Sequence, residues 1–163
     1  MRALDIENIG RIGLMFIDGD LLRDVMADPF TCDEDDTNYN IPAFNELKVA
    51  LLKIERINPD LYISGVLWQC YPANKRMVAP AVVGKSLPRG GWGPSPGWLI
   101  NDAPAPLMEA ITQKKCVTVT EKDGKTTCYF PVKTAAGDVV GALELGEKDR
   151  PANIISNYTQ NAQ

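Results

Sequence analysis

The segment from Cys116 to Leu145 reads CVTVTEKDGKTTCYFPVKTAAGDVVGALEL and contains three β-rich runs separated by two turn signals. Asp123-Gly124 suits a tight hairpin turn, because glycine accepts a positive φ angle without a Cβ clash. Ala136-Gly137-Asp138 marks the second turn. We therefore expect an antiparallel meander near the centre of the fold.

The side chains of the first hairpin predict its register. With Asp123 and Gly124 as the two loop residues, Val119 lies opposite Cys128, and Cys116 and Cys128 point to opposite faces. A slip of one residue would mix apolar and hydroxyl-bearing side chains on each face. One face would then hold Val117, Val119, Cys128, Phe130 and Val132, and the other Thr118, Thr120, Thr127 and Tyr129.

Length and composition describe one domain with a sizeable core: 163 residues, 45% of them hydrophobic. The net charge of −4 and the lack of a basic patch in the sequence argue against a nucleic-acid partner. The apolar piece 12–17 is far shorter than the ~20 residues that span a bilayer. Two early acids, Asp5 and Glu7, do not fit a secretory signal. These features predict a cytoplasmic protein without a membrane partner.

The four cysteines, at positions 32, 70, 116 and 128, include no Cys-x-x-Cys pair. Their spacing excludes zinc-ribbon and thioredoxin-like sites, and we predict no metal site. In a cytoplasmic protein we expect four free thiols.

Residues 4–26 carry apolar side chains at roughly helical spacing, but Gly10, Gly13 and Gly19 interrupt the pattern. We expect one helix near 20–27. This segment is either a dimerisation or linker helix or a helix that covers the sheet, and the second interpretation is favoured. The acidic loop 28–40 does not match the ligand spacing of an EF-hand calcium loop.

The strongest helix pattern spans 42–57, and two strands follow it at 63–71 and 77–83. In the first strand, alternation places Val66, Trp68 and Cys70 on one face. Pro80 in the second strand indicates a sheet edge or a bulge.

Residues 84–106 are rich in glycine and proline and predict a long irregular segment, which in compact domains is often functional. Trp92 and Trp98 in this loop are either pocket aromatics or staples that hold the loop to the domain, and Trp68 is either a pocket or a core residue. Asn101 and Asp102 either orient a polar ligand or cap the next helix, expected at 107–114.

This element order predicts an α+β fold with a single antiparallel sheet of five or six strands and helices packed on one face. We expect an N-terminal helical segment and acidic loop at 1–41 and the main domain at 42–146. Residues 147–163 would form a tail or the start of a connecting helix.

The run Tyr129-Phe130-Pro131-Val132, followed by residues 137–145, resembles the last hairpin of a GAF domain, and PAS-type sensors end similarly. The order of elements over about 42–146 is also similar to that of the GAF family. The resemblance implies a sensor that closes the 84–114 segment over a ligand pocket. The ligand residues would be Trp68, Cys70, Trp92, Trp98, Asn101, Asp102, Cys128 and Phe130.

The resemblance implies a non-catalytic regulatory domain of a bacterial signalling protein, which binds a small molecule, forms a homodimer, or both. Its attached output domain would be of the HD phosphodiesterase, cyclic-dinucleotide synthase or histidine kinase kind. The chain has no histidine, which excludes imidazole ligation of haem and a Cys-His bilin site, and no cofactor is identified. The alternative is a GAF-like free methionine-R-sulfoxide reductase that uses Cys70, Cys116 and Cys128.

Overall fold

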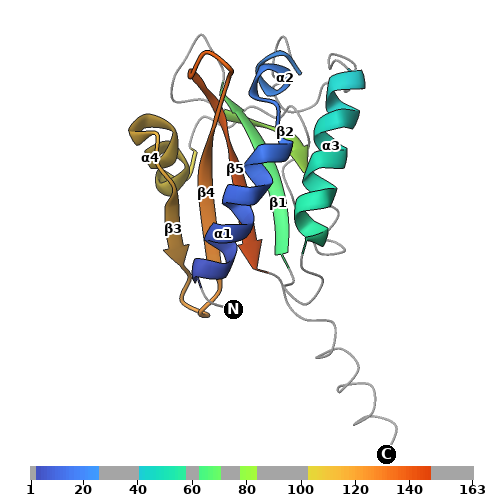
Figure 1. Cartoon of the computed structure of the whole chain (residues 1–163). Helices are drawn as coiled ribbons and strands as arrows, with labels where there is room; N and C mark the ends of the chain where they lie inside the picture. The colour runs from blue at the N-terminus through green and yellow to red at the C-terminus, as the bar shows by residue number, and fades with distance from the viewer. Residues whose placement is uncertain (1–2, 26–40, 58–62, 71–77, 84–102, 148–163) are drawn as a thin grey trace, which may run out of the picture.

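The structure is a computed structural model, and it describes residues 3–25, 41–57, 63–70, 78–83 and 103–147 (Figure 1). Trp92, Trp98, Asn101, Asp102 and Cys32 lie outside the described residues, as do the predicted acidic loop and tail. The helices are α1 (Ala3–Gly13), a short 3₁₀ helix η1 (Leu14–Phe16), α2 (Gly19–Asp24), α3 (Ile41–Arg56) and α4 (Ala105–Gln113). The strands are β1 (Ile63–Cys70), β2 (Val78–Val83), β3 (Val117–Thr120), β4 (Thr126–Lys133) and β5 (Val139–Glu147).

The strands form one sheet in the order β2-β1-β5-β4-β3, and every pair of neighbours is antiparallel. This confirms the predicted α+β class with a single antiparallel sheet. The predicted meander is present as β3, β4 and β5. Pro80 lies in β2 at the sheet edge, and the β1–β2 register shifts beside it, between Leu67 and Trp68. An edge and a bulge are the two places where a strand tolerates proline.

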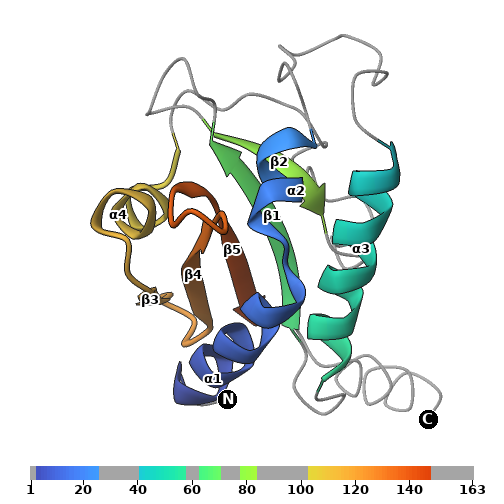
Figure 2. The same ribbon diagram turned by 45° about the horizontal axis from the view of Figure 1, so that its top comes forward.

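Helices cover both faces of this sheet, so the prediction that they pack on one face is wrong (Figures 1 and 2). α1, α2 and α3 pack against alternate residues of the strands, including Leu67 and Phe130. α4 packs against the residues between them, including Trp68 and Tyr129. The reason is that β1, β4 and β5 carry apolar side chains at successive positions, and an apolar sheet face must be covered.

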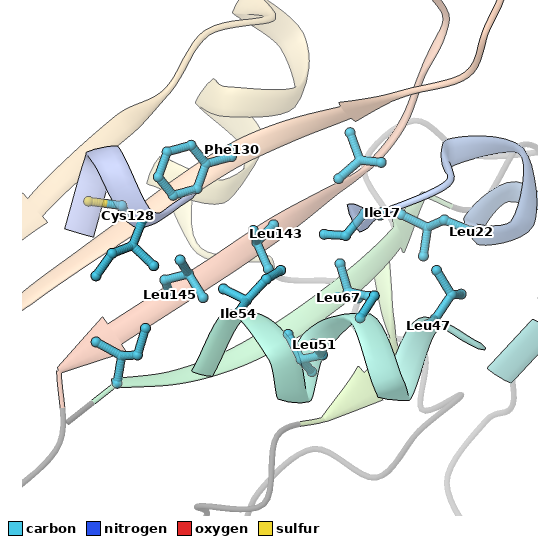
Figure 3. Close-up of a cluster of buried hydrophobic side chains, with 14 of the residues drawn as sticks. Ile17, Leu22, Leu47, Leu51, Ile54, Leu67, Cys128, Phe130, Leu143 and Leu145 are labelled. Carbon is cyan, nitrogen blue, oxygen red and sulfur yellow. The ribbon is translucent and has the colours of Figure 1, made fainter. Parts of the chain in front are cut away.

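The larger core lies between the sheet and α1–α3 (Figure 3). α3 confirms the helix predicted from its apolar spacing, because residues three and four apart share one helix face. That face buries Ala43, Leu47, Ala50, Leu51 and Ile54 against the sheet residues Ile63, Leu67, Leu143 and Leu145.

α1 also covers the sheet, which confirms the favoured interpretation of the N-terminal segment. Ile6 and Ile9 are buried in the same core as β4. A Cβ atom on Gly10 would lie 2.0 Å from Cζ of Phe130. The glycine that interrupts the apolar pattern is therefore the position where the helix axis comes close to the sheet. One helix near 20–27 was too simple a prediction, because α1 and η1 precede α2.

The first hairpin differs from its predicted register by one residue. The observed pairs are Val117 with Tyr129, Thr118 with Cys128, and Val119 with Thr127. Val117 therefore packs on the α4 side and Phe130 on the α1 side, whereas they were expected to share a face. Cys116 packs against the same core that buries Cys128, so these two cysteines share a side, also contrary to prediction.

The length of the loop causes this shift. The amide of Glu121 donates to the carbonyl of Lys125 over 2.7 Å, and the amide of Gly124 donates to Glu121 over 2.9 Å. The loop is therefore Lys122-Asp123-Gly124, with Gly124 at φ 84°, and not Asp123-Gly124 alone. Three-residue hairpin loops of this kind place a left-handed residue last. Because strand side chains alternate, one extra loop residue moves every side chain of β3 to the other face.

The second hairpin uses the same loop. The amide of Thr134 donates to Asp138 over 2.9 Å, and the amide of Gly137 donates to Thr134 over 2.9 Å. Gly137 has a φ of 91°. Each turn of the meander thus depends on its own glycine in the left-handed region, Gly124 in the first and Gly137 in the second.

Candidate functional site

The sheet separates the four predicted site residues that the structure describes. Trp68 belongs to the core on the α4 side, and strand alternation directs Cys70 to the same side. Cys128 and Phe130 are buried under α1 on the opposite side. The structure therefore does not bring Cys128 and Phe130 together with Trp68.

A row of four residues crosses the sheet on the α4 side. Glu144 of β5 is paired with Val66 of β1 and with Tyr129 of β4, and Tyr129 is paired with Val117 of β3. Residues directly opposite each other in antiparallel strands have their side chains in contact range. A carboxylate therefore lies in the middle of the sheet, between an aliphatic and an aromatic side chain.

Trp68 fixes the orientation of this carboxylate. Its indole nitrogen Nε1 donates a hydrogen bond to Oε2 of Glu144 over 2.6 Å. Hydrogen bonds to an ionised acceptor are short and strong. Trp68 is 5% exposed, so its indole is held by packing as well as by this bond. Of the two interpretations of Trp68, the structure shows the core residue, and the same residue also holds the acid.

The surroundings of Glu144 are mainly apolar. α4 contributes Leu107 and Ala110, which are fully buried, and Met108 and Ile111 pack beside them. Burial raises the pKa of Glu144, and the hydrogen bond from Trp68 opposes that shift. Burial also raises the pKa of Tyr129, and the nearby charges of Glu144 and Glu121 add to the effect. Both groups are thus held in a setting that disfavours their charged forms.

Two side-chain oxygen atoms at this site have no hydrogen bond from the described residues. Among the described residues, no hydrogen bond reaches Oε1 of Glu144 or the hydroxyl group of Tyr129. Both side chains are held by packing, and Tyr129 is only 8% exposed. Neither oxygen is among the fully buried polar atoms that have no hydrogen-bond partner, so both can still accept or donate a hydrogen bond at the surface.

Glu144 was not predicted as a site residue. The sequence signal was a single acid in the otherwise apolar strand 139–145, at the position that alternates with Ala142. Ala142 itself faces α4. The usual interpretation of such an acid is a solvated strand position, and only the packing of α4 makes this face an interior one.

The three described cysteines are free thiols and do not form one cluster. Cys70 lies on the α4 side, whereas Cys116 and Cys128 lie on the α1 side. Burial raises the pKa of Cys70 and of Cys128 to about 11. It also raises the pKa of Cys116. This arrangement gives no support to the cysteine-dependent reductase, because thiolates are the reactive form.

Within the described ranges, no group of histidine, cysteine and acidic residues has the arrangement of a metal site. None of the helices in those ranges is both long enough and apolar enough to cross a membrane.

The solved structures to which the chain is similar include two GAF domains. The chain is similar to one GAF domain structure with 10% identity and a TM-score of 0.48, over 96% of this chain and 84% of that one. It is also similar to the nlh2 GAF domain of A. aeolicus in an inactive state, with 11% identity and a TM-score of 0.48, over 98% of this chain and 90% of that one. No family model and no curated protein matches the sequence.

Proposed function

We propose that this chain is a non-catalytic, GAF-like regulatory domain of a cytoplasmic signalling protein, and that it binds a small molecule on the α4 side of its sheet. The observation that carries the proposal is the pair formed by Glu144 and Tyr129. Each presents an oxygen without a hydrogen bond from the described residues, next to the indole of Trp68. The order of helices and strands that underlies the sequence resemblance is also the order found here.

The chemistry of the pair defines the ligand class. A carboxylate and a phenol hydroxyl together favour a ligand that donates hydrogen bonds, such as an amine, an amide or a protonated heterocycle. The apolar side chains of α4 and the indole favour a flat or aliphatic body. Nucleobases, amino acids and their amides combine both properties and form the first set to test.

A thermal-shift screen of those compounds tests the proposal. A ligand at one hundred times its dissociation constant should stabilise the fold by ~2.7 kcal/mol. Glu144→Gln and Tyr129→Phe should each weaken binding at least tenfold, because each removes a ligand contact of ~1.5 kcal/mol or more. Glu46→Gln, at an exposed position of α3 on the other side of the sheet, is the matched control and should bind as the unchanged chain does. Equal effects of Glu144→Gln and Glu46→Gln would place the ligand elsewhere.

Homodimer formation is a second part of the proposal. Met15 is 84% exposed and Phe16 46% exposed in η1, and Val49 of α3 is 51% exposed. Phe16 and Val49 line the same groove between η1 and α3. Exposed apolar patches of this kind mark interaction sites, and two-fold dimers are the commonest oligomers. In a longer protein, such a dimer would transmit the ligand signal to an attached HD phosphodiesterase, cyclic-dinucleotide synthase or histidine kinase.

Sedimentation of the purified chain over a range of concentrations tests the dimer. Met15→Glu should weaken self-association, because the dimer would bury the new carboxylate. The monomer should be little affected, because water solvates this exposed side chain. Lys48→Glu on α3 is a charge-altering control. A monomeric mass at millimolar concentration would exclude this part of the proposal.

A further inference from the structure

A pocket lies along the open edge of β4, beside the end of α1. It has a volume of about 380 Å³ and opens between the end of α1, the α4–β3 connection and the last residues of β4. Its lining residues are Arg11, Leu14, Ile17, Lys114, Lys115, Cys116, Phe130, Pro131, Val132 and Lys133. None of these is acidic. In a chain with a net charge of −4, this collects four cationic side chains around one hollow.

Two of the four cations have no ion pair with another described residue. Arg11 pairs with Glu7 over 3.7 Å, and Lys115 pairs with Glu109 over 3.4 Å. In the described part of the chain, neither Lys114 nor Lys133 has an ion pair. An anion in the pocket would meet these two lysines without displacing an existing partner.

The backbone of Lys114 gives an independent indication. This residue follows α4 with φ 55° and ψ 37°, and among the described residues it is the one non-glycine residue with a positive φ. Helices usually place glycine or asparagine at this left-handed position, because a Cβ atom costs about 1–2 kcal/mol there. A lysine at a position where glycine is more stable is consistent with a role for its charge.

The floor of the pocket is apolar. Ile17, Phe130 and Val132 belong to the main core. The wall formed by residues 130–133 is available because β3 pairs with β4 only as far as Tyr129. Pro131 has no amide hydrogen, so this part of the wall offers fewer backbone donors and more apolar surface.

We propose that this pocket binds a small organic anion, a carboxylate or a phosphate monoester. Its charged end contacts Lys114 and Lys133, and its apolar body lies over the floor beside Phe130. This site is independent of the α4-side site, because it lies at the edge of β4 and shares none of Trp68, Tyr129 and Glu144. Failure of one proposal therefore leaves the other standing.

Titration of the full chain with benzoate, phenyl phosphate and inorganic phosphate, followed by NMR, tests this site. At least one of the two aromatic anions should bind more tightly than inorganic phosphate, because only the aromatic anions cover the apolar floor. Which of the two binds better distinguishes a carboxylate site from a phosphate site. Affinity should fall as sodium chloride is raised, since salt screens exposed charges. No saturable shift of residues 114–116 and 130–133 with any probe would overturn the proposal.

Substitutions separate binding from folding. Lys133→Gln should weaken binding about fivefold, the effect expected for one charge-assisted contact. Lys122→Gln, in the exposed β3–β4 loop, is the matched control and should leave affinity unchanged. Lys114→Gly should weaken binding and raise Tm together, because glycine relieves the left-handed backbone. Equal affinity in all three variants would overturn the proposal.

Cys116 offers a further readout. It lines the pocket, whereas Cys70 lies on the other side of the sheet. The aromatic anion that binds should slow alkylation of Cys116 and leave that of Cys70 unchanged. Equal protection of both thiols would indicate general stabilisation, and it would overturn the assignment of the ligand to this pocket.

Discussion

Thr118 of β3 lies directly opposite Cys128 of β4, and its hydroxyl oxygen is 3.3 Å from the sulfur of Cys128. The same hydroxyl donates a hydrogen bond to Oε1 of Glu7 in α1 over 2.7 Å. A threonine of the edge strand thus connects a buried thiol with the helix that covers it. This contact depends on the loop between β3 and β4, which has three residues and places Gly124 in the left-handed region.

We therefore predict that Gly124→Ala lowers the free energy of unfolding by about 1–2 kcal/mol, and Gly137→Ala by a similar amount. No atom lies within 4 Å of a Cβ placed at either position, so the cost comes from the backbone alone. Urea unfolding measures it. Asparagine tolerates the left-handed region better, so Gly124→Asn should cost less than Gly124→Ala. A reversed order would show that the loop does not hold this conformation.

Gly10→Ala tests the close contact between α1 and the sheet. On an exposed helix this change would stabilise by about 0.5–1 kcal/mol. Here the added methyl group meets the ring of Phe130, and overpacking of a core typically costs about 1–3 kcal/mol. We expect a net loss of stability in thermal and urea unfolding. Gly146→Ala is the control, because its nearest atom would be 3.4 Å away. Stabilisation by Gly10→Ala would contradict the packing described here.

The raised pKa of Glu144 has a consequence for stability. Because the folded chain holds this proton more tightly than the unfolded chain does, stability falls as pH rises from the ordinary glutamate value of 4.5 through the folded pKa of Glu144. Glu144→Gln keeps an oxygen for the Trp68 hydrogen bond and removes the charge. The stability of the variant relative to the unchanged chain should therefore increase with pH across this window. A difference that stays constant from pH 4 to pH 8 would contradict the assignment.

Thiol reactivity should follow burial. At pH 8 a thiol with a pKa of about 11 is ionised in about one molecule per thousand, against about one in ten at a pKa of 9.0. We expect iodoacetamide to modify Cys70 and Cys128 at least tenfold more slowly in the native chain than in urea, with Cys128 slowest because it is fully buried. Peptide mass spectrometry resolves the sites. Native rates within threefold of the denatured rates would show that these thiols are accessible.

Much of the fold follows from local pattern. The apolar spacing of α3 and the glycines of both turns suffice to predict a helix and a meander. Loop length was harder to predict, because Asp123-Gly124 fits a two-residue loop and also the end of a three-residue loop. Both choices give acceptable faces for β3, since threonine is tolerated on either side. In the observed register Thr118 faces α1, where its hydroxyl donates to Glu7, and this long-range contact is not visible in the local sequence.

The candidate site was harder to predict than the fold. Trp68 was recognised from its residue type and strand position, but Glu144 was not, because an acid in a strand is usually solvated. Glu144 lies in mainly apolar surroundings because α4 covers its face of the sheet, and the sequence analysis placed no helix on that face. The pocket beside Lys114 depends in the same way on contacts among α1, β4 and the α4–β3 connection, which are distant in sequence.

The short length of β3 has a further consequence for how the molecule avoids aggregation. An unpaired strand edge is a template on which another chain can extend the sheet. Beyond Tyr129, β4 has no partner on its β3 side among the described residues, and this open edge carries Pro131 and Lys133. Proline cannot donate to a new strand, and a lysine resists burial by one. Pro131 and Lys133, which line the cationic pocket, therefore also disfavour the addition of a strand from another chain at this open edge.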